Sequence, residues 1–134
     1  MKLVDTDILI DLSHDLLQAI QFFETLRNKG ETLAISAVTK MELIQGCRTK
    51  TELKWTIEFL EEFMLIHISE PISQKAVELI EGYKLSHGLL IPDAIVAATA
   101  ISMNLEFYSR DVRHFKIIKE LTVISPYTQN VTIT

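Results

Sequence analysis

The sequence contains a single cysteine, Cys47, which excludes an internal disulfide and any zinc site built from several cysteines. One free thiol fits a reducing cytoplasm. No uninterrupted apolar run reaches the roughly 18 residues that a membrane span requires. At the N-terminus an acid follows after only Leu3 and Val4, which a signal peptide would not allow. We therefore expect a cytoplasmic protein with no membrane partner.

Basic residues are also scarce. The chain has 13 Lys and Arg against 18 Asp and Glu, a formal net charge of −5 and a pI near 5.3. A general nucleic-acid binder normally carries an excess of Lys and Arg. A nuclease is not excluded, because cations bound at its site would neutralise part of the negative charge. Any nucleic-acid contact should then be local and metal-assisted, and a basic peptide partner would also suit this surface.

The chain does have enough apolar residues for a core, at 48% of 134 residues, and it shows no internal repeat, low-complexity tract or linker. We expect residues 1–134 to form a single domain. Short strands alternate with helices, which predicts an α/β fold, a three-layer sandwich on a small parallel sheet. The expected strands are 2–5, 32–35, 65–68, 105–108 and 121–124. The expected helices are 6–13, 15–28, 37–46, 49–63, 69–87 and 93–103, with a short turn or helix at 111–115.

Four acidic residues lie where strands should end and helices begin. They are Asp5 in VDTDILID, Glu42 in SAVTKMELIQG, Asp93 in IPDAIVAATA and Asp111 in YSRDVRHF. In open parallel sheets, ligand sites lie beyond the carboxyl ends of the strands. Asp5 ends the first strand and Asp111 closely follows the fourth, while Glu42 is long enough to reach back over the sheet edge. We expect all four side chains to project into one cleft.

Carboxylates gathered in one cleft repel each other, so protons or cations must compensate their charge. Mg²⁺ and Mn²⁺ are the cations that best suit oxygen ligands of this kind. Such an ion polarises a phosphate and lowers the pKa of a bound water. The implied chemistry is phosphodiester hydrolysis by metal-activated water, without a covalent intermediate. Taken singly, each acid could instead be a helix cap, a surface group or, for Asp111 beside Arg113, half of a salt bridge.

Together these four segments resemble PIN-domain ribonucleases, and within them the VapC toxins of prokaryotic toxin–antitoxin pairs. The resemblance covers nearly the whole chain and implies a PIN-like sandwich of about five strands with endoribonuclease activity. It implies a site for Mg²⁺ (or Mn²⁺) with Asp5 and Asp93 as direct ligands. Glu42 and Asp111 would complete that site, directly or through water, and help to orient the nucleophile. Ser109 matches a position that often carries a hydroxyl, which would hydrogen-bond an acid.

The resemblance also implies partners. A cognate VapB-like antitoxin would lay a helix and an extended tail over the cleft, DNA would be bound only indirectly through that antitoxin, and the chain would form a homodimer. Asp7 departs from many relatives, which carry Asn there, and we expect it to stabilise the first helical turn. Asp111 is present where some relatives have Asn, so the acidic set is complete.

Arg110 and Arg113 flank Asp111 and are the best candidates for contacts with RNA phosphates, which position a substrate without reading its sequence. Trp55 and Phe59 lie four residues apart, a spacing that favours a place in the core. A subunit or antitoxin interface is the alternative for this pair.

The histidines lack the spacing of a histidine-based zinc site, and we expect His114 and Phe115 to pack beneath their loop.

Two other functions compete with a nuclease. A signalling receiver domain would need a phosphorylatable Asp after the third strand and a Lys after the last. Ile68-Ser69 and Ser125-Pro126 stand there instead. A catalytically silent PIN module that binds RNA or a partner protein is the stronger alternative, and metal-dependent cleavage would separate it from a nuclease.

Overall fold

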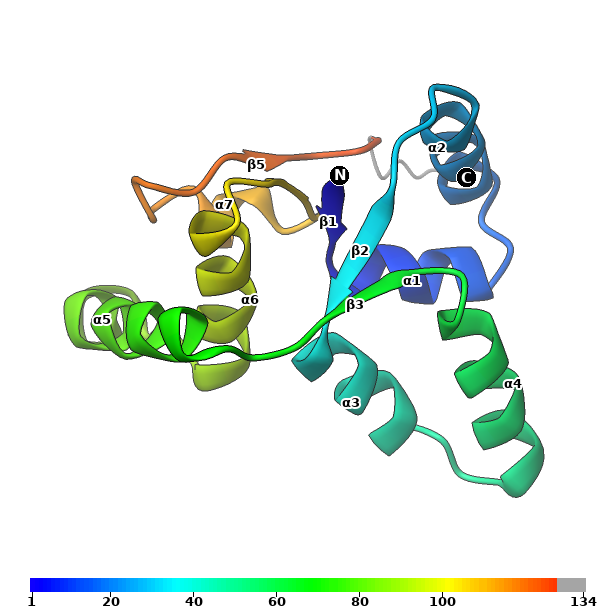
Figure 1. Ribbon diagram of the computed structural model, residues 1–134, viewed down its shortest axis with the longest axis horizontal. Coiled ribbons are helices and arrows are strands. Elements are labelled where there is room, and N and C mark those ends of the chain that lie inside the picture. Colours follow the sequence, from blue (N-terminus) through cyan, green and yellow to red (C-terminus); the bar gives the residue numbers. More distant parts are fainter. Residues whose placement is uncertain (128–134) are drawn as a thin grey trace, which may run out of the picture.

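Five strands form one parallel sheet in the computed structural model, which describes residues 1–127 (Figure 1). Their order across the sheet is β3-β2-β1-β4-β5, and every pairing is parallel. The predicted small parallel sheet is therefore confirmed. The strands are β1 Lys2–Val4, β2 Leu33–Ser36, β3 Met64–Ile66, β4 Glu106–Tyr108 and β5 Val123–Ile124.

Helices cover both faces of this sheet (Figure 1). Successive residues of a strand point to opposite faces, so Leu3 packs into one apolar cluster with α5 and α6, whereas Val4 packs into the other with α1 and α2. This arrangement confirms the predicted three-layer sandwich. The helices are α1 Thr6–Ser13, α2 Leu17–Asn28, α3 Ala37–Gln45, α4 Lys50–Leu60, α5 Glu70–His87, α6 Ile91–Ser102 and α7 Val112–Phe115.

Helix boundaries differ from the prediction where a single residue decides them. The helix expected from residue 15 begins at Leu17, because Asp15 takes a left-handed conformation with φ of 58°. The helix expected from Asp93 begins two residues earlier, at Ile91, with Pro92 in its first turn. Gly88 ends α5 with φ of 66°, as the sequence predicted.

The strand order places a reversal point at the carboxyl edge of the sheet. β1 has β2 on one side and β4 on the other, so the order of the strands reverses between β1 and β4. Ligands of open parallel sheets bind at such a reversal. Asp5 follows β1 and Ser109 follows β4, and these two neighbouring strands bring them together.

No helix in the described 127 residues has the length and apolarity needed to cross a membrane.

Candidate active site

Asp5 lies at the point where β1 ends and α1 begins. It is the N-cap of α1, and its Oδ1 accepts a 2.8 Å hydrogen bond from the backbone N–H of Thr6. Its Oδ2 accepts a 2.7 Å hydrogen bond from the hydroxyl of Ser109, a side chain with no exposed surface. A cap and a buried hydroxyl therefore fix both oxygens of this carboxylate.

Asp7 takes part in the same site, beyond the role in the first helical turn that the sequence predicted. Its Oδ2 accepts a 3.1 Å hydrogen bond from the backbone N–H of Arg110, in the loop that follows β4. Its Oδ1 is buried and has no hydrogen-bond partner among the described residues. Burial raises the pKa of Asp7, and the N–H and the charge of Arg110 counteract that rise in part.

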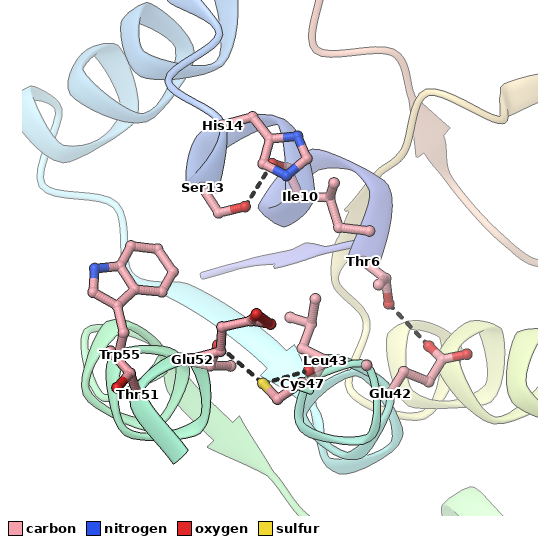
Figure 2. A pocket seen from close by; sticks show the side chains of 12 residues that line it. Thr6, Ile10, Ser13, His14, Glu42, Leu43, Cys47, Thr51, Glu52 and Trp55 are labelled. Atoms are coloured by element: carbon pink, nitrogen blue, oxygen red, sulfur yellow. Dashed lines mark hydrogen bonds between the residues drawn. The ribbon is translucent and has the colours of Figure 1, made fainter. Parts of the chain in front are cut away.

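The other three predicted acids lie around Asp5 on separate elements. Glu42 is exposed on α3, and its Oε1 accepts a 3.0 Å hydrogen bond from the hydroxyl of Thr6 (Figure 2). Asp93 is partly exposed on α6, and its Oδ2 lies 3.1 Å from Nε2 of His114. Asp111 is exposed where α7 begins, and its backbone N–H donates to the hydroxyl of Ser109 at 3.0 Å.

Electrostatics connect Asp5 to two of its neighbours. Burial and then repulsion by Asp7 raise the pKa of Asp5 to about 7, and Asp93 adds to the rise. The hydrogen bonds from Ser109 and Thr6 oppose it. Asp7 and Asp93 are thus close enough to Asp5 for their negative charges to act on its carboxylate. The expected gathering of all four predicted acids is less complete, since no three acidic, His or Cys side chains in the described part stand ready to hold an ion together.

The two candidate substrate arginines differ in their contacts. Nη1 of Arg110 lies 2.9 Å from each carboxylate oxygen of Asp11, and the hydroxyl of Tyr127 donates to the same carboxylate at 2.6 Å. Arg113 is exposed and forms no hydrogen bond or ion pair with the described residues. Of the two predicted phosphate contacts, only the guanidinium of Arg113 is therefore without a partner among residues 1–127.

Known proteins with the same sequence pattern and fold decide the family. The PIN domain matches residues 2–121. The chain belongs to the PIN-domain family. It is 32% identical to ribonuclease VapC19 of Mycobacterium tuberculosis over 122 residues, which are 90% of this chain and 97% of that protein.

Two solved structures show the same PIN-domain fold. A toxin–antitoxin complex from Klebsiella pneumoniae contains a chain that is 35% identical, with a TM-score of 0.77 over 95% of this chain and 98% of that one. VapBC2 of Rickettsia felis, solved with a DNA fragment of its promoter, gives a TM-score of 0.78 at 23% identity, over 92% and 97% of the two chains. The fold implied by the sequence resemblance is therefore shown.

The oxygen donors of this PIN domain fit a hard divalent cation. Asp5, Asp7 and Asp93 bring negative charge together, which Arg110 offsets only in part at Asp7, and the buried Oδ1 of Asp7 has no hydrogen-bond donor among the described residues. Mg²⁺ commonly takes only one or two carboxylates and keeps several waters. Two carboxylates on neighbouring elements therefore suffice, and a ready-made group of three ligands is not needed.

A cavity of about 600 Å³ opens beside Glu42, between α1, α3 and α4 of the PIN domain (Figure 2). Thr6 and Glu42 lie at one end of it and Trp55 at the other. Trp55 is 50% exposed, so its predicted place in the core is wrong, although it stacks on the partly buried Phe59 with ring centroids 5.0 Å apart. The cavity gives the PIN domain an apolar groove that leads to an acid of the site.

Sequence reasoning missed two contacts of the site. The expected packing holds for the buried Phe115, but His114 faces Asp93 instead. Asp11, which accepts hydrogen bonds from both Arg110 and Tyr127, was not predicted as a site residue. The one available signal was the spacing of Asp7 and Asp11, since residues four apart share a helix face.

Proposed function

We propose that this PIN domain is a metal-dependent endoribonuclease toxin, with Asp5 and Asp93 as ligands of Mg²⁺ or Mn²⁺. One observation carries the proposal. The Asp5 carboxylate is held where the strand order reverses, and its pKa is raised to about 7 by burial and by the nearby charges of Asp7 and Asp93. A fold that keeps such charge together, with Arg110 offsetting it only in part at Asp7, is suited to a bound cation.

The chain's own residues have distinct roles in this proposal. Ser109 and the N–H of Thr6 orient Asp5, and Glu42 approaches the same turn through the hydroxyl of Thr6. Asp111 is exposed beside Ser109, from where it would orient the attacking water. A divalent cation would supply a Lewis acid for the phosphate and lower the pKa of that water. Arg113 would bind a neighbouring phosphate of the RNA.

We further propose a VapB-like antitoxin as the partner that inhibits this site. The similar Klebsiella protein was solved as a toxin–antitoxin complex, which supports antitoxin binding here. Any contact with DNA would then be made only through the antitoxin. The cavity beside Glu42 would receive an antitoxin helix, whose tail would reach the acids. A basic side chain in that tail would offset their charge.

The proposal also covers assembly and location. A second, mostly apolar cavity of about 350 Å³ lies between α5 and α6, and exposed Val77 and Ile91 line it. This face suits the expected homodimer. We propose that residues 1–134 act as one PIN domain in the cytoplasm, where RNA substrates are found.

A silent PIN module that binds RNA or a partner remains the second candidate. The observation that favours it is the lack, in residues 1–127, of a preformed group of three metal-binding side chains.

The test is cleavage of total cellular RNA by the purified, antitoxin-free protein with Mg²⁺ or Mn²⁺. We expect discrete fragments that disappear with EDTA and in Asp5→Asn and Asp93→Asn, while both variants remain folded. Glu24→Gln, an exposed acid on α2, is the matched control and should cleave normally. Lack of cleavage by the folded protein with both metals would favour the silent module, and unfolding of the Asn variants would indicate structural roles.

A further inference from the structure

Residues 109–114 contact the carboxylates of both proposed metal ligands, Asp5 and Asp93. Ser109, directly after β4, donates to Oδ2 of Asp5, and Nε2 of His114, in α7, lies 3.1 Å from Oδ2 of Asp93. The ligands belong to different elements, Asp5 to the start of α1 and Asp93 to the first turn of α6. The six residues 109–114 thus contact one oxygen of each carboxylate.

Packing holds the His114 ring in place. Its backbone N–H donates to the carbonyl of Asp111 at 3.2 Å, and its ring lies edge-on to Phe115, with centroids 5.2 Å apart. Phe115 is 2% exposed and packs edge-on against Phe107 of β4. The His114 ring therefore packs against the apolar core, with Nε2 directed toward the carboxylate of Asp93.

His114 is the only described side chain that pairs with Asp93, since no Lys or Arg lies within ion-pair distance of it. A carboxylate oxygen only accepts hydrogen bonds, so Nε2 is the donor. That contact uses Oδ2 and leaves Oδ1 of Asp93 for another partner.

We propose that His114 is a positioning residue for the divalent-cation site, which holds the Asp93 carboxylate so that its second oxygen faces the cation. The inference rests on the proposed function, because it requires Asp93 to be a ligand. Partners that hydrogen-bond a ligating carboxylate orient it, and their loss typically weakens metal affinity or activity about 10–100-fold. Without His114, the Asp93 side chain would lose the described contact that holds its Oδ2.

The experiment measures Mn²⁺ binding by calorimetry, with RNA cleavage as a second readout. The proteins are the wild type, His114→Ala, His114→Gln, Asp93→Asn and the control His87→Ala, an exposed histidine whose recorded contacts are Ser86 and Tyr83. We expect His114→Ala to weaken Mn²⁺ binding about tenfold or more. His114→Gln, whose amide N–H can replace Nε2, should recover most of that loss, which a purely structural role would not predict. His87→Ala should match the wild type.

The outcomes separate this inference from the proposed function. If the wild type binds no Mn²⁺, or Asp93→Asn binds as well as the wild type, the metal site itself is wrong. If Asp93→Asn loses binding but His114→Ala keeps wild-type affinity or binds more tightly, only the role of His114 is wrong. Urea unfolding of each variant is measured first, and if His114→Ala does not fold, failure of a folded His114→Gln to bind within about threefold of the wild type overturns the inference.

Discussion

Asp5 shows how strongly the position of a residue changes its chemistry. An aspartate in a flexible chain ionises near pH 4, but burial and the neighbouring Asp7 raise the pKa of Asp5 to about 7. The folded state therefore holds a proton that the unfolded state releases between these two values. Because the folded state binds more protons there, its free energy of unfolding decreases as pH rises through this window.

We predict that the metal-free protein is more stable near pH 5 than near pH 7.5, by an amount on the order of 1–3 kcal/mol from Asp5. Asp7, whose pKa burial also raises, adds to the effect with the same sign. Asp5→Asn should lessen the dependence and be more stable than the wild type near pH 7.5. Urea unfolding in EDTA at several pH values measures both.

Glu24→Gln on exposed α2 provides the control for this measurement, since it removes a carboxylate without touching the site. A wild type whose stability increases from pH 5 to 7.5, with Asp5→Asn showing the same slope as Glu24→Gln, would contradict a raised pKa at Asp5.

The two arginines beside Asp111 should respond differently to substitution. Arg113 has no partner among the described residues, so Arg113→Ala should raise the KM for RNA several-fold and change stability by less than about 0.5 kcal/mol. Its loss should also make binding less sensitive to salt. Arg110→Ala should chiefly destabilise the protein, because Asp11 loses its ion pair. A larger KM effect at Arg110 than at Arg113 would reverse these assignments.

Among the elements, α1 anchors the loop that follows β4. Asp7 and Asp11 lie one turn apart on α1, and they accept hydrogen bonds from the backbone N–H and the guanidinium of Arg110, respectively. Tyr127 also donates to Asp11, and burial together with that carboxylate raises the pKa of Tyr127, so its hydroxyl keeps the proton. The loop that carries Ser109 and Asp111 is thus held by a helix and by the chain beyond β5.

We predict that Asp11→Asn lowers the free energy of unfolding by about 2 kcal/mol, because it removes the ion-pair partner of the partly buried Arg110. Tyr127→Phe should cost about 1 kcal/mol, the typical value of one hydrogen bond. Since both changes act on one network, the double variant should lose less than the sum of the two. Chemical denaturation of the wild type, the two single variants and the double variant gives the coupling free energy between the two contacts. Strict additivity of the losses would show that the contacts are independent.

The elements themselves were largely visible in the sequence, because apolar periodicity and alternation depend on neighbours in the chain. Boundaries changed where one residue decided them, such as the left-handed Asp15 that delays α2. The four acids were also visible in the sequence, through the four motifs that contain them. The His114–Asp93 contact was not, since it joins residues 21 positions apart on two helices whose relative placement only packing determines.

At the scale of the whole molecule, a net charge of −5 means that the acidic site and its surface favour a basic partner over free RNA. The cavity beside Glu42 offers such a partner an apolar groove next to the acids. Trp55, the only tryptophan of the chain, lies half-exposed in that groove and so reports on its occupation.

We predict that the proposed antitoxin shifts the fluorescence of Trp55 to shorter wavelength when it binds, because its helix would remove water from the indole. Trp55→Ala should weaken binding about tenfold or more, as expected when a central aromatic contact is removed. Ile57→Ala, on the same helix but outside this cavity, is the matched control and should bind normally. Calorimetry gives the affinities independently of the fluorescence. Tight binding with an unchanged emission spectrum, and no loss in Trp55→Ala, would place the antitoxin on another face of the molecule.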